Sequence, residues 1–179
     1  MAIPDSNANG VSYWTRRHIV VELLDASGGH RQVVPSGEGD VSIGNLNAGT
    51  KNGANREAVP VYNRGRYEGM VEGDDSTNDF SVTCRIPRTA LTPSARSSIV
   101  SCLTFKGAWA DATTADPLGE VNCHRVLLRL SNAGAETTLI LLPNARLTGT
   151  FTDGEIVTLA LSGTNYEPVL FDADATAAV

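Results

Sequence analysis

Lysine is scarce in this sequence. Of its 14 basic residues only Lys51 and Lys106 are lysines, and the formal net charge of the 179 residues is −6. Proteins that bind nucleic acid by neutralising phosphates need a concentrated cationic surface, which this balance does not favour. The composition therefore argues against an ordinary basic DNA-binding protein, although it leaves open that DNA passes close to the molecule.

Cysteines and long apolar runs are also few. Cys84, Cys102 and Cys123 are an odd number at wide spacings, which fits neither a disulfide framework nor a paired zinc motif, so we expect buried free thiols. No run approaches the roughly 18 to 20 consecutive apolar residues that span a bilayer. The polar start from Met1 to Gly10 is unlike a signal segment. These absences predict a soluble protein that is made without export and has no membrane partner.

The length of the chain sets its domain organisation. A chain of 179 residues is long enough for one hydrophobic core and short for two, so we expect a single domain over residues 1–179. The polar residues 1–11 are typical of an N-terminal arm, and the small residues 173–179 are typical of a C-terminal tail.

Alternation of apolar and polar residues predicts strands along most of the chain. Phe80, Val82, Cys84 and Ile86 alternate with polar neighbours, which is the period of a strand with one buried face, and Pro87 ends the pattern. Similar runs bring the expected total to about eight to ten strands, at His18 to Leu24, Arg31 to Val34, Val41 to Ile43, Val59 to Tyr62, Val121 to Leu130, Thr137 to Leu142 and Ile156 to Leu161.

Two hairpins are expected late in the chain. The strand from Arg146 to Phe151 is followed by Thr152-Asp153-Gly154 and a second apolar run, and Asp-Gly supplies the positive φ that tight turns require. Residues 131–134, Ser-Asn-Ala-Gly, predict another turn just before it.

One helix is predicted, over residues 92–106. Thr92 offers an N-cap oxygen, Pro93 suits the first helical position, and Lys106 with the glycine after it suits the end. Ala95, Ile99, Cys102 and Leu103 form a single apolar stripe. A helix of this kind lies against the surface of a sheet.

A long polar connection is predicted from Asn45 to Ala58. Its 14 residues, NLNAGTKNGANREA, exceed the usual connection of roughly two to six, and such loops are commonly functional. It is either a loop without a function or a segment that docks onto another molecule.

No constellation of residues supports catalysis or a cofactor. Cys123 and His124 are adjacent in a predicted strand and so point to opposite faces, where they cannot chelate one ion. His18 and His30 could meet across a hairpin, but two histidines alone make a weak metal site. The acidic residues between Glu72 and Asp79 suit calcium chemically but lack a spaced calcium loop, which favours a solvated turn. We therefore expect no enzyme activity, no metal and no cofactor.

Tyr62 and Tyr67 flank a predicted turn, Asn63-Arg64-Gly65-Arg66. They could form a stacking platform of the kind that a carbohydrate-binding module uses. The favoured interpretation is that they pack against each other across their own hairpin, because cross-strand aromatic pairs stabilise sheets without a ligand.

The C-terminal stretch ARLTGTFTDGEIVTLALSG, residues 145–163, resembles the closing hairpin of phage major tail tube proteins. The resemblance covers a strand, a short polar turn and an apolar strand that ends near a glycine. It gains weight from the mostly β character of the chain, the single helix, the long polar loop between early strands and the polar termini.

This resemblance implies a mainly β fold, a β-sandwich or barrel-like subunit with one flanking α-helix and a long early loop. Such subunits close into rings, expected to be hexameric, that stack into the tail tube and deliver genome DNA into the host. The expected partners are further copies of the chain, other tail proteins, and DNA that passes without specific binding. The protein would be made in the host cytoplasm and reside in the virion tail. The candidate subunit contacts in the loop are Asn45, Lys51, Asn52 and Arg56.

Two other functions also fit the sequence. One is a different virion component, such as a head decoration or a tail adaptor, and the other is a carbohydrate-binding β-sandwich module. The acidic balance agrees with a DNA conduit, because a wall that bound phosphates tightly would stall the DNA.

Overall fold

A computed structural model of the chain describes residues 19–35, 41–46, 55–87, 92–131, 137–153, 156–172 and 176. The N-terminal arm predicted at 1–11 lies outside these residues, and of the predicted C-terminal tail they include only Thr176.

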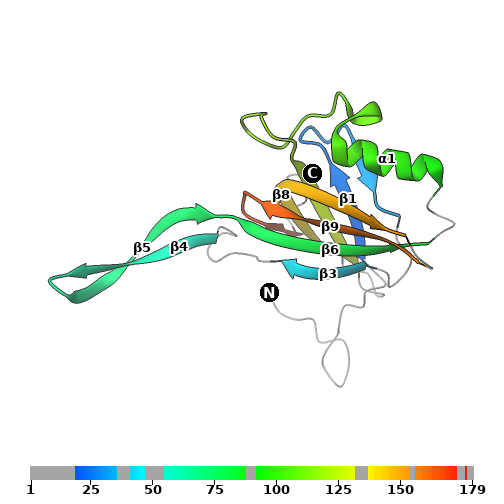
Figure 1. The fold of residues 1–179 in the computed structure, drawn as a ribbon. Helices are drawn as coiled ribbons and strands as arrows, with labels where there is room; N and C mark the ends of the chain where they lie inside the picture. Colours follow the sequence, from blue (N-terminus) through cyan, green and yellow to red (C-terminus); the bar gives the residue numbers. More distant parts are fainter. Residues whose placement is uncertain are drawn as a thin grey trace, which may run out of the picture.

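Most of the described strands belong to one antiparallel sheet (Figure 1), with the order β2-β1-β7-β8-β9-β6-β3. A short strand, β10, also pairs with β8, and a second sheet contains β4 and β5 alone. The strands are β1 (Ile19–Leu24), β2 (Arg31–Val33), β3 (Val41–Leu46), β4 (Asn55–Asn63), β5 (Arg66–Ser76), β6 (Asn78–Ile86), β7 (His124–Ser131), β8 (Thr137–Thr152), β9 (Val157–Asn165) and β10 (Leu170–Phe171).

The large sheet curls around a single main core. Val34, which follows β2, and Val41, in β3, lie in the same buried cluster although their strands stand at opposite ends of the sheet. Within the described residues the two end strands do not pair, so the sheet stays open. The predicted mainly β fold with one α-helix is confirmed.

Strand β8 runs through a position where the sequence predicts a break. The prediction placed separate strands on either side of Pro143 and Asn144, but β8 is continuous over 16 residues. A register shift relieves the problem, because β8 has one residue more than β7 between the pairs Val126↔Leu142 and His124↔Ala145. Proline is tolerated in strands at such bulges, where no ladder hydrogen bond is lost.

The helix forms where the sequence predicts it. Helix α1 (Pro93–Thr104) begins with Thr92 Oγ1, which accepts a hydrogen bond from Ala95 N at 3.1 Å. It ends at Phe105, whose left-handed φ of 50° lets the backbone N–H bond back to the last turn. A short 3₁₀ turn, η3 (Gly107–Trp109), follows. None of the described helices is both long and apolar enough to cross a membrane.

Removing the N-cap is expected to destabilise the protein modestly. Thr92→Ala leaves the N–H of Ala95 without its side-chain acceptor, which typically lowers the free energy of unfolding by about 1 kcal/mol. Urea unfolding would measure this loss. The exposed Ser97→Ala on the same helix is the control, and an equal loss in both variants would contradict a capping role.

The largest difference from the sequence prediction concerns the region from Asn45 to Ala58. Strand β3 continues to Leu46 and β4 begins at Asn55, so only residues 47–54 can connect them, and these lie outside the described residues. The polar residues near Ala58 form a strand because they pair with the part of β5 beyond Tyr67. The sequence did not predict this part of β5. The two strands make a long hairpin that projects from the body (Figure 1), which we call the arm (residues 55–76).

Candidate assembly surfaces

The arm exposes apolar side chains on both of its faces. Val59 pairs with Val71 and therefore shares a face with it, whereas Met70 pairs with Pro60 on the other face. Met70 and Val71 are 64% and 53% exposed. An isolated two-stranded hairpin is only marginally stable in water. Exposed apolar positions on such a ribbon are therefore best explained by a partner that covers them.

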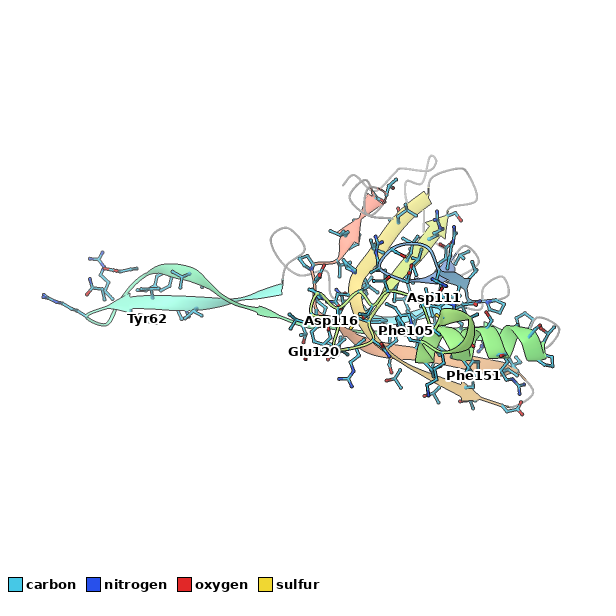
Figure 2. All side chains as sticks on the ribbon, turned by 90° about the horizontal axis from the view of Figure 1, so that it is seen from above. Tyr62, Phe105, Asp111, Asp116, Glu120 and Phe151 are labelled. Carbon is cyan, nitrogen blue, oxygen red and sulfur yellow. The ribbon has the colours of Figure 1, made fainter. Side chains whose placement is uncertain are left out.

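Tyr62 and Tyr67 face each other near the tip of the arm. Their ring centroids are 5.9 Å apart and their planes are inclined at 67°, which is an edge-to-face pair across the hairpin. The cross-strand interpretation is confirmed. Figure 2 shows Tyr62 far from the body, and both rings remain more than half exposed, at 62% and 52%.

The four residues proposed as subunit contacts are only partly placed by the structure. Asn45 lies in β3 and Arg56 lies in β4, so both belong to strands and not to a loop as predicted. Lys51 and Asn52 lie outside the described residues. Arg56 is part of the arm, at its base, where it pairs with Asp75.

The acidic residues do not form the predicted solvated turn. Glu72, Asp74 and Asp75 lie in β5 and Asp79 lies in β6, because this stretch pairs with β4 and β9. Asp79 Oδ1 accepts a hydrogen bond from Thr164 Oγ1 at 2.9 Å. Among the described residues no group of three or more histidine, cysteine or acidic side chains is arranged to hold a metal ion.

The cysteines and histidines have structural surroundings. All three cysteines are free and buried, as predicted, and burial raises the pKa of Cys84 and Cys102 to about 12. His124 donates from Nε2 to the carbonyl of Cys102 at 3.0 Å, and burial lowers its pKa. His30 Nε2 lies 3.2 Å from a carboxylate oxygen of Asp111. Its predicted partner, His18, lies outside the described residues.

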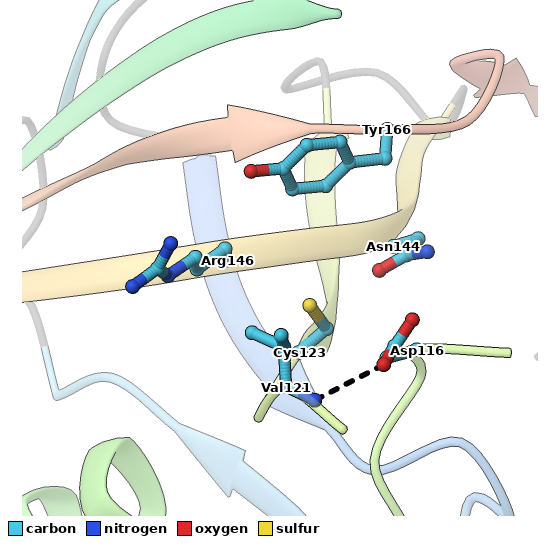
Figure 3. A pocket seen from close by; sticks show the side chains of 6 residues that line it. All are labelled: Asp116, Val121, Cys123, Asn144, Arg146 and Tyr166. Carbon is cyan, nitrogen blue, oxygen red and sulfur yellow. Dashed lines mark hydrogen bonds between the residues drawn. The ribbon is translucent and has the colours of Figure 1, made fainter. Parts of the chain in front are cut away.

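A small pocket opens where β8 and β9 meet the segment before β7 (Figure 3). Its volume is about 310 Å³. Figure 3 shows the ring of Tyr166 across the pocket from Asp116, with Asn144 at one end and Arg146 at the other. None of these four residues is predicted from the sequence as part of a site, because they come from segments far apart in the chain. The described residues that line it are Asp116, Val121, Cys123, Asn144, Arg146 and Tyr166.

The carboxylate of Asp116 organises one wall of this pocket. Its Oδ2 accepts hydrogen bonds from Val121 N at 3.0 Å and Glu120 N at 2.9 Å, and its Oδ1 accepts a longer one from Leu118 N at 3.4 Å. The bond from Val121 is the main cause that lowers the pKa of Asp116. The pKa of Cys123 is raised, mainly by burial and further by the negative charge of Asp116. The positive charge of Arg146 opposes this rise.

Comparison with known structures gives the fold its context. No protein-family model matches the chain, and no curated protein matches it in sequence. The anti-feeding prophage cap, a tube-terminating cap, superposes with a TM-score of 0.52 at 18% identity, over 96% of this chain and 99% of that chain. The PVC sheath/tube terminator of an extracellular contractile injection system superposes with a TM-score of 0.50 at 14% identity, over 87% and 94%.

The fold is shared with components of contractile injection systems. A chain from the PVC sheath-tube complex gives a similar result, with a TM-score of 0.51 at 14% identity over 88% of this chain and 89% of that chain. The tail-protein resemblance seen in the sequence therefore holds at the level of fold.

Proposed function

We propose that this chain is a structural subunit of a phage-like tail, which assembles with further copies into stacked rings that form a conduit for genome DNA. The observation that carries the proposal is the arm: a hairpin of 9-residue and 11-residue strands projects from a curled sheet and exposes apolar side chains on both faces. The shared fold with tube-associated proteins supports the same conclusion.

The open sheet offers a second means of assembly. Strands β2 and β3 end the described sheet, and an end strand carries backbone groups that a strand of another subunit can satisfy. Strand pairing between subunits would extend the sheet around a ring, and the arm would reach onto a further subunit. Ring closure of this kind uses the same surface pair at every contact.

The charge of the chain suits passage of DNA. A net charge of −6 disfavours tight binding of the phosphate backbone, so DNA would slide without specific contacts. In this function the protein has no enzymatic turnover and no cofactor, and after synthesis in the host it resides in the tail of the particle.

A tube-terminating subunit is the second candidate, because two of the structural neighbours are a terminator and a cap. The two candidates differ in the length of the assembly. A tube subunit forms stacks that lengthen with concentration, whereas a terminator forms single rings. Negative-stain electron microscopy and analytical ultracentrifugation of the purified chain distinguish them, and a strictly monomeric species at every concentration contradicts both.

Charge placed on the arm is expected to abolish assembly without unfolding the body. Met70→Lys with Val71→Lys puts two ammonium groups where the proposal buries apolar side chains, and an unpaired buried charge is strongly unfavourable. Sedimentation velocity should show monomers at concentrations where the unsubstituted chain forms rings.

The matched control is Ile156→Lys. Ile156 is also apolar and is 54% exposed, but it precedes β9 in the body and lies neither on the arm nor in the pocket. This variant should assemble normally. If the arm variant assembles as well as the Ile156 variant, the arm is not an assembly contact.

A further inference from the structure

The pocket beside β8 contains a buried polar atom that the described part of the chain leaves unsatisfied. Asn144 is 5% exposed, and no donor among the described residues bonds to its Oδ1. Its backbone is well fixed, because Asn144 N donates to Asn165 Oδ1 at 3.1 Å and Asn144 O accepts from Tyr166 N at 2.9 Å. A buried acceptor without a donor costs roughly 1 to 3 kcal/mol. A ligand that donates an N–H group to Oδ1 would therefore recover this free energy.

The other acceptor at this end of the pocket is Asp116. Its Oδ2 already accepts two backbone N–H groups. Among the described residues its Oδ1 has only the contact of 3.4 Å from Leu118 N, so it keeps capacity for a further donor. Figure 3 shows Asp116 and Asn144 next to each other at one end of the pocket. A group that donates to both must carry at least two N–H bonds, and the carboxylate favours a cation.

Tyr166 and Arg146 complete the recognition. The Tyr166 ring lines the pocket opposite Asp116, and an aromatic ring attracts a cation over its face. Arg146 lies at the far end with its guanidinium directed away from Asn144 (Figure 3), so it does not occupy the acceptor end itself. A volume of about 310 Å³ is at the lower limit for small-molecule sites, roughly 300 to 1,000 Å³, and suits a single side chain.

We propose that this pocket binds an arginine side chain from a second copy of the chain, through Asp116, Asn144 and Tyr166. The guanidinium is planar and has five N–H donors in a fixed fork, which matches two neighbouring oxygen acceptors and a ring face. An anion would meet Asp116 and the Asn144 oxygen at this end, both of which repel it.

The arm tip supplies the arginine. Arg64 and Arg66 lie at the turn between β4 and β5, and both are exposed. Figure 1 shows the turn directed away from the body, and Figure 2 shows Asp116 in the body, so the tip does not reach the pocket of its own chain. The assignment of the donor to a second copy rests on the proposed assembly, whereas the pocket can be tested on the single chain.

The first test uses N-ethylguanidinium chloride as a probe of the isolated chain. Titration followed by amide chemical shifts should give saturable changes at Asp116, Val121 and Tyr166, with sodium chloride at equal ionic strength as the reference. Asp116→Asn should weaken binding about tenfold, as expected for loss of a charge-assisted hydrogen bond. Tyr166→Leu should also weaken binding of the probe, and it removes none of the hydrogen bonds that hold the Asp116 loop.

The matched control for charge is Glu120→Gln. Glu120 is exposed on the same loop but does not line the pocket, so this variant changes the net charge by the same amount and should bind normally. Absence of saturable shifts overturns the pocket. Shifts with sodium acetate but not with N-ethylguanidinium overturn it in favour of an anion site at Arg146.

The second test is a double-mutant cycle in the assembly. Asp116→Asn and the pair Arg64→Gln with Arg66→Gln should each raise the concentration needed for assembly about tenfold, and their combination should raise it little further. Additive effects overturn the assignment of the donor to the arm tip. If the unsubstituted chain never assembles, the proposed function fails, while the titration with N-ethylguanidinium still decides the pocket.

Discussion

Replacing Gly163 with alanine is expected to lower the free energy of unfolding by more than about 3 kcal/mol, at the upper end for overpacked sites. Gly163 lies in β9, between Phe80 of β6 and Leu147 of β8. A Cβ there would stand 2.1 Å from Arg146 O and 3.3 Å from Leu147 Cα. These atoms belong to the backbone, so no side-chain rotation relieves the contact and the strands must separate.

Urea unfolding measures this loss, because the midpoint urea concentration and the slope m together give the free energy of unfolding in water. Ser162→Ala is the control, because Ser162 is the neighbouring residue of β9 and is exposed. Its effect should stay within about 0.5 kcal/mol, as is usual for surface substitutions. If Gly163→Ala and Ser162→Ala have the same free energy of unfolding, β8 and β9 are not closely apposed at Gly163.

Asp25→Asn is expected to give the second largest loss, about 2 kcal/mol at neutral pH. Asp25 is 1% exposed. Its carboxylate accepts hydrogen bonds from Ser27 Oγ at 2.6 Å, His30 N at 3.1 Å and Thr113 N at 3.2 Å. It therefore holds the β1–β2 turn against the segment that follows η3. An amide nitrogen in place of one oxygen would face at least one of these donors.

The contribution of Asp25 depends on pH in a defined direction. Burial raises its pKa, but the hydrogen bonds from Ser27, His30 and Thr113 outweigh burial and lower the pKa from 3.8 to about 2. The folded state therefore holds the proton less tightly than the unfolded state. The stabilisation is complete above the unfolded pKa of 3.8 and is lost as the pH falls toward 2.

Unfolding free energies of the unsubstituted chain and Asp25→Asn, measured between pH 6 and pH 2, test this prediction. The difference between the two proteins should narrow by about 2 kcal/mol as the pH falls from 4 to 2. Asp153→Asn, which makes the same substitution at an exposed position, is the control. A difference that stays constant with pH would mean that the ionised carboxylate does not stabilise the turn.

The parts of the fold that sequence predicted are those with local causes. Thr92 and Pro93 define the start of α1 by their own chemistry, and the alternation of Phe80, Val82 and Cys84 marks β6 because one face of that strand is buried. The central strands of the sheet were found for the same reason. Neither inference needs information about a distant segment.

The parts of the fold that the sequence missed depend on pairing with a partner strand. Strand β5 contains two glycines and several acidic residues, which have low strand propensity, and it is a strand because β4 pairs along most of its length. Continuity of β8 through Pro143 likewise depends on the bulge opposite β7. Propensity is a weak guide where the partner strand decides the conformation.

The pocket was not predictable as a site, although one local signal was available. Asp116 precedes a proline, and an aspartate before proline commonly starts a turn by accepting hydrogen bonds from the following backbone. That signal explains the loop but not its neighbours. Asn144 and Tyr166 reach the same pocket only through the bend of β8 and the end of β9.

The arm also has a consequence for the order of events during synthesis. Its two strands are adjacent in sequence, so the hairpin can close once residue 76 has left the ribosome. Strand β6, in contrast, pairs with β9 from Asn78↔Asn165 onward, so the curled sheet cannot be completed until nearly the whole chain exists. Local pairs form before distant ones. In the assembly that we propose, a nascent chain would therefore present its arm to finished subunits before its own body is complete.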